Sequence, residues 1–116
     1  MSADLRAKLL ALDDMEREQL HIPEWGQTVY VRVMTAAERE GLEVAVFEAR
    51  SRKEALTYRA HVAVATVCDA EGVLLFTHAD IPALAKKSGK ALMRIVAASE
   101  RLNALTEAAV EEKAKN

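Results

Sequence analysis

The sequence predicts a mainly helical α+β fold, a compact helical domain with one small β-hairpin near the N-terminus. Hydrophobic residues make up 51% of the 116 positions but aromatic residues only 4%, so Ala, Val, Leu and Ile must build the core. That composition favours packed helices over a sheet sandwich, which uses more β-branched and aromatic side chains. The chain has only four Gly and two Pro, the residues that most favour turns, so few long loops are expected. A chain of this length is expected to form one domain, residues 1–116, around one core.

The first predicted element is a short helix within residues 1–12. Ser2 is suited to the N-cap position, and Leu5, Leu9 and Leu12 are spaced to share one helical face. The following segment offers these leucines no obvious partner. Packing against a neighbouring copy of the chain is one way to cover them.

Residues 16–33 are predicted to form the β-hairpin. A turn cluster at 23–26 (PEWG) separates two runs, and the second run, 28–33 (TVYVRV), alternates apolar and polar residues. Val29, Val31 and Val33 therefore share one face of the predicted strand.

A helical region is predicted from residue 35 to residue 113, starting at a capping box formed by Thr35 and Glu38. The first helix of this region should bury a stripe three and four residues apart, which Val44 and Phe47 would widen. The stripe consists of Leu42, Ala45, Val46 and Ala49. After a break or bend near Ser51, a second helical pattern begins at Lys53.

This second pattern ends in a run, residues 60–68, that is apolar nearly all round. The run at 62–67 (VAVATV) also fits a strand, and periodicity does not separate the two in so short a segment. The alanine content and the continuity with the preceding residues favour a helix.

The C-terminal half is predicted to contain a turn and three more helices. The turn lies at 69–72 (DAEG), and an extended piece follows at 73–76. Thr77, Ser88 and Thr106 are each placed to cap a helix, with Pro82 tolerated in the first turns of the earliest one. The segment from residue 111 onward is a charged tail.

The charge balance and the single cysteine limit the classes of function. The formal net charge is −2, and the basic group Arg50, Arg52 and Lys53 is flanked by acidic residues, so we expect no nucleic-acid partner. Cys68 stands alone, so neither an intrachain disulfide nor a thiolate cluster is expected. We expect no signal peptide and no membrane-spanning segment, and a cytoplasmic location fits.

We find no pattern of catalytic chemistry and expect that the protein is not an enzyme. His21, His61 and His78 are far apart in sequence and form no metal-ligand spacing. The scattered glycines form no phosphate-binding loop, and no serine lies in a nucleophile elbow. No catalytic residue, cofactor or metal site is therefore predicted.

Besides the first helix, two features and one further stripe indicate contacts with other proteins. Trp25 lies at the hairpin turn, where it either folds back over the chain or meets a partner. The apolar run near Val62 and Val64 is one candidate contact surface for a client or a second subunit. The C-terminal stripe is the other, and it contains Leu92, Ile95 and Val96. Burial in the chain's own core is the alternative for the residues of the run and of the stripe, and the sequence favours it there, whereas the two interpretations of Trp25 are equally supported.

Residues 59–116 carry a pattern that resembles the tail assembly chaperones of phages and prophages with long, non-contractile tails. The matching segments are 67–72 (VCDAEG), 75–77 (LFT), 84–88 (LAKKS) and 101–106 (RLNALT), followed by an acidic helix, and 34–39 (MTAAER) is similar to the family's helix start. The first helix matches poorly. Ala70 stands where the family has an acidic residue, His78 interrupts an acidic cap, and Ala104 stands where glycine is frequent.

The resemblance implies a non-catalytic chaperone that binds the tape measure protein, keeps it soluble and assists tail tube assembly. It also implies a homo-oligomer, a ring or a spiral, in the host bacterial cytoplasm, absent from the mature virion. Members are often made in a second, frameshifted longer form that would contact the tail tube protein. Two other interpretations are a minor structural tail or head–tail connector protein and a prophage regulator that binds DNA.

Overall fold

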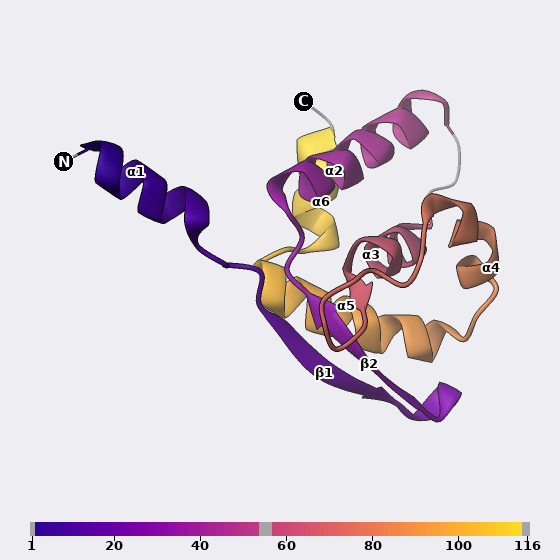
Figure 1. Cartoon of the computed structure of the whole chain (residues 1–116). Helices are drawn as coiled ribbons and strands as arrows, with labels where there is room; N and C mark the ends of the chain where they lie inside the picture. The colour runs from indigo at the N-terminus through magenta and orange to yellow at the C-terminus, as the bar shows by residue number, and fades with distance from the viewer. Residues whose placement is uncertain (1, 54–56, 115–116) are drawn as a thin grey trace.

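The computed structural model describes residues 2–53 and 57–114 and shows a helical fold with a small sheet (Figure 1). This part of the chain contains six α-helices and three strands. The helices are α1 (Ser2–Ala11), α2 (Ala36–Ser51), α3 (Tyr58–Thr66), α4 (Ile81–Ala85), α5 (Gly89–Asn103) and α6 (Glu107–Ala114). The strands are β1 (Arg17–Ile22), β2 (Gln27–Arg32) and β3 (Val67–Cys68). The predicted fold class is confirmed.

The predicted hairpin is the main part of the sheet. β1 and β2 pair antiparallel with Leu20 opposite Val29, and a 3-10 turn over Pro23–Trp25 joins them. Gly26 closes this turn at φ 59°, a left-handed conformation that glycine adopts without steric cost. Val29 and Val31 face inward on β2, as the alternation predicts.

A short third strand forms at the end of the apolar run. β3 pairs antiparallel with β2, with Val31 opposite Val67, and directly follows α3. The apolar run at 62–67 is therefore helix up to Thr66 and strand at Val67. The helix and the strand considered for this run therefore occupy adjacent parts of it. The helix ends where the chain reaches β2 and pairs with it.

Most predicted helix starts are found where the capping residues place them. The Thr35 hydroxyl accepts a hydrogen bond from the Glu38 amide at 3.0 Å, and the Glu38 carboxylate accepts one from the Thr35 amide at 2.8 Å. Ser88 and Thr106 accept bonds from amides three residues on, at 3.4 and 3.0 Å. The helix start predicted at Lys53 is wrong, because Lys53 has a φ of 57° and terminates α2. α3 begins only at Tyr58, and residues 54–56 lie outside the described range.

The core lies on both sides of α3. One cluster fills the space between the sheet, α3, α4 and α5 and contains Ile22, Val64, Leu84, Leu92 and Ile95. A second cluster lies between α2, α3 and α6 and contains Leu42, Val46, Val62 and Val110. Residues 60–66 of α3 are mostly apolar because the helix packs into both clusters, while Arg59 of the same helix is exposed.

A buried polar network connects the hairpin to α3 and α5. The Asn103 side-chain oxygen accepts a hydrogen bond from the Met34 amide at 2.7 Å, and its amide donates to the Ser99 carbonyl at 2.9 Å. One helical turn earlier, the Ser99 and Thr66 hydroxyls lie 2.9 Å apart, and the Thr66 hydroxyl also donates to the Val62 carbonyl. These bonds fix where α5 sits along α3 and along the start of α2.

The helix α1 stands apart from this core. Every residue from 2 to 12 is exposed, and Figure 1 shows α1 projecting from the body on the connecting segment before β1. The Cα radius of gyration is 15.5 Å, whereas a compact domain of this length has about 13 Å. The projection of α1 contributes to this difference.

Replacing Asn103 with Ala should destabilise the fold. The Met34 amide would lose its buried acceptor, which costs about 1–3 kcal/mol of the free energy of unfolding. Urea denaturation followed by circular dichroism measures this change. The control is Lys86→Ala at an exposed position, which should stay within about 0.5 kcal/mol of the parent. Equal midpoints for the two variants would show that the network does not contribute.

Candidate functional site

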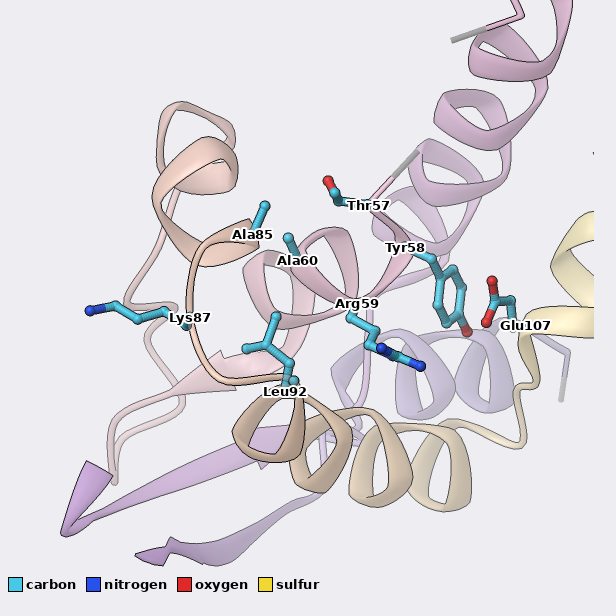
Figure 2. Close-up of a pocket in the computed structure, with 9 residues that line it drawn as sticks. Thr57, Tyr58, Arg59, Ala60, Ala85, Lys87, Leu92 and Glu107 are labelled. Carbon is cyan, nitrogen blue, oxygen red and sulfur yellow. The ribbon is translucent and has the colours of Figure 1, made fainter. Parts of the chain in front are cut away.

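One pocket lies between α3, α4, α5 and the start of α6, with a volume of about 290 Å³ (Figure 2). Figure 2 shows the side chains of Arg59 and Lys87 extending away from each other, so the two cations do not converge on one ligand position. At one end the Tyr58 hydroxyl donates a hydrogen bond to the Glu100 carboxylate at 3.2 Å. The carboxylate also accepts from the Glu107 amide at 3.0 Å, so both groups join α3 to the α5–α6 connection.

The titratable groups with clear shifts are poor nucleophiles or surface ions. Burial, and then the nearby Glu100 carboxylate, raise the pKa of Tyr58 above its ordinary range, which keeps the phenol protonated. Burial also raises the pKa of Cys68, so its sulfur is a thiol rather than a thiolate at neutral pH. The Arg94 guanidinium lowers the pKa of the exposed Glu24 carboxyl.

The structure brings together two histidines that the sequence separates. The rings of His61 and His78 lie 6.3 Å apart, edge to face, while His21 lies on β1 beside Thr28. Within residues 2–53 and 57–114, no three His, Cys, Asp or Glu side chains are grouped so that they could hold a metal ion. In the same ranges, no helix is long and apolar enough to cross a membrane.

Four of the predicted contact residues lie in the chain's own core. Val62 and Ile95 have no exposed surface, and Val64 and Leu92 are 6% and 4% exposed. The interpretation of these residues as a surface for a client is corrected, because α3 and α5 pack them inside the two clusters. Core burial was the favoured alternative for them.

The other two predicted contact residues are half-buried. Trp25 folds back from the hairpin turn and packs against the first cluster. The turn is held there by Glu24, whose carboxylate accepts two hydrogen bonds from Arg94 of α5 at 2.8 and 3.0 Å. Val96 packs against the second cluster. Neither side chain offers a large free surface.

The apolar surface of the molecule lies elsewhere. On α2, Val44 is 53% and Phe47 is 50% exposed, so the prediction that they widen the buried stripe is wrong. They lie on the side of α2 that α3 and α6 leave uncovered. The remaining large exposed apolar side chains of the described residues are Leu5, Leu9, Leu10, Leu12, Val73, Leu75 and Met93.

A groove also opens beside α2. It lies between α2, α3 and the 74–78 segment and has a volume of about 460 Å³. Its lining is mainly apolar and includes Gly41, Val64, Ala65, Leu74 and Phe76. No side chain fills the space above Gly41, since a Cβ atom placed there would meet nothing within 4 Å. We call this space the α2–α3 groove. Sequence analysis missed it because it depends on how three distant segments pack.

Comparison with solved structures shows a likeness in fold to a phage protein. The chain is similar to the tail assembly chaperone of bacteriophage HK97, with a TM-score of 0.63 over 92% of this chain and 100% of that one. Sequence identity is 16%, so the likeness concerns the fold. No protein-family model matches the sequence. The curated proteins contain no match either.

Two substitutions on α5 separate core residues from surface residues. Ile95→Ala should lower the free energy of unfolding by about 2–5 kcal/mol, because it opens a cavity in the first cluster. Met93→Ala, on the same helix but 54% exposed, should change it by less than about 0.5 kcal/mol. Thermal and urea denaturation measure both. If Ile95→Ala were as stable as the parent, Ile95 would not be a core residue, and a contact with a partner would again be possible for it.

Proposed function

We propose that the protein is a phage tail assembly chaperone, which binds the tape measure protein and keeps it soluble without catalysis. The observation that carries the proposal is the likeness in fold to the HK97 tail assembly chaperone, which extends over the whole of that protein. The sequence pattern in residues 59–116 supports the same assignment independently.

The distribution of apolar surface agrees with a binding role. The two clusters bury the inward faces of α2, α3, α5 and α6, yet α1 and the outer face of α2 still expose leucine, valine and phenylalanine. Scattered single apolar residues are ordinary on a protein surface, whereas groups on one element indicate a contact. A chaperone that must later release its client needs several modest contacts of this kind rather than one tight interface.

The proposal has three further parts. The chain self-associates, so that a row of copies coats one long client. A longer form made by frameshifting contacts the tail tube protein. The protein acts in the cytoplasm of the host bacterium and is absent from the finished particle, unlike a minor structural tail or connector protein.

Co-expression with the tape measure protein of the same phage tests the proposal. The client should move from the pellet to the soluble fraction and co-purify with this chain. Replacing Val44 and Phe47 with Ser should reduce the co-purified client several-fold, because the exposed apolar face of α2 is lost. Glu40→Ser, an exposed polar change on the same helix, is the matched control.

Two results would contradict the proposal. One is a client that stays as insoluble with this chain as without it. The other is detection of the chain, by mass spectrometry, in purified virions at a fixed copy number, which would favour a structural tail or connector protein.

A further inference from the structure

The helix α1 requires a cover that its own domain does not give it. Leu5, Leu9 and Leu12 are 58%, 57% and 63% exposed. An isolated helix of ten residues is shorter than the roughly 12–15 residues at which helices become even marginally stable in water. A stable α1 therefore implies contact with another surface.

The three leucines have the spacing of helix anchors. They lie four and three residues apart, and the Leu12 amide continues the helical turn by donating to the Leu9 carbonyl at 3.3 Å. Helices that bind in grooves of other proteins use anchors at this spacing. Leu10, 70% exposed, lies on a different side of the helix.

The α2–α3 groove matches such a helix in chemistry and charge. Its lining combines small residues, Gly41 and Ala65, with larger apolar ones, Leu74 and Phe76. α1 has two basic side chains and one acidic, whereas α2, which borders the groove, has four acidic and two basic. The opposite signs favour approach of α1 to α2.

We propose that α1 of one copy docks in the α2–α3 groove of a second copy, with Leu5, Leu9 and Leu12 as its anchors. The inference rests on the self-association in the proposed function and names the surfaces that make it. We call α1 the arm. Each chain supplies one arm and one groove, so every arm in an assembly of equal copies has a groove to bind. In the structure α1 points away from its own body on the connecting residues 12–16, which is the arrangement that a neighbour requires (Figure 1). Contacts of this head-to-tail kind can add copy after copy.

Matched leucine variants test the arm. Analytical ultracentrifugation of the full chain, without client, should give a mass of two or more chains for the parent and for Leu10→Ser. Leu9→Ser should shift the mass toward that of one chain, 12.7 kDa. A parent protein that is a single chain at micromolar concentrations would overturn the inference, as would equal masses for the two variants.

Matched glycine variants test the groove. Gly41→Leu adds a large side chain to the lining of the groove, and should give single chains with an unchanged far-ultraviolet circular dichroism spectrum, since a Cβ atom at Gly41 meets nothing within 4 Å. Gly89 also faces open space but lies on α5, outside the α2–α3 groove, so Gly89→Leu should retain the parent's mass. If Gly41→Leu assembles like the parent, the groove is not the docking site.

Cysteine pairing separates docking between copies from docking within one chain. Chains carrying Leu9→Cys, mixed with chains carrying Gly41→Cys, should form a disulfide-linked pair faster than either variant alone. The native Cys68 is buried and does not compete. A chain carrying both changes that closes its own disulfide at high dilution would overturn the inference, because the arm would then fill its own groove.

These assays use no client, so they fail or succeed independently of the chaperone proposal. If the chain assembles through α1 but the client stays insoluble, the inference holds and the proposed function is wrong. If a chain that remains a monomer still makes the client soluble, the proposed function holds and the inference is wrong.

Discussion

The structure depends on the burial of α5 against α3 and the sheet. Ile95 and Leu92 close the first cluster, while Ser99 and Asn103 on the same helix bond to α3 and to the chain between β2 and α2. Buried polar groups are costly unless they are paired, so these hydrogen bonds fix the positions of α3, α5 and the hairpin relative to one another. α2 and α6 then pack against α3 and form the second cluster with it.

Once this core is closed, the remaining apolar surface is concentrated at a few places. Most of the apolar run of α3 is buried in the two clusters, and Val64 and Ala65 are the members of the run that line the α2–α3 groove. The outer face of α2, the α2–α3 groove and the arm α1 remain. A fold with a small core and a projecting helix that exposes leucines is suited to binding other chains, which agrees with the proposed chaperone role.

Local signals in the sequence predicted most elements, and the non-local packing was not predictable. Thr35 with Glu38, Ser88 and Thr106 mark helix starts through bonds to nearby amides, and the PEWG turn marks the hairpin. The two-residue strand β3 exists only because Val67 meets β2, thirty-odd positions earlier in the chain. The burial of Val62 and Val64, the exposure of Val44 and Phe47, and the groove above Gly41 likewise depend on which helices pack together, which periodicity within one segment does not encode.

The central claim is that the apolar surface outside the core, α1 above all, is covered by other protein chains. Amide hydrogen exchange of the full-length protein over a range of concentrations measures this directly. The account predicts that α3 and α5 are protected at every concentration, while α1 gains protection as concentration rises. Fast exchange throughout α1 at all concentrations, with and without client, would contradict it.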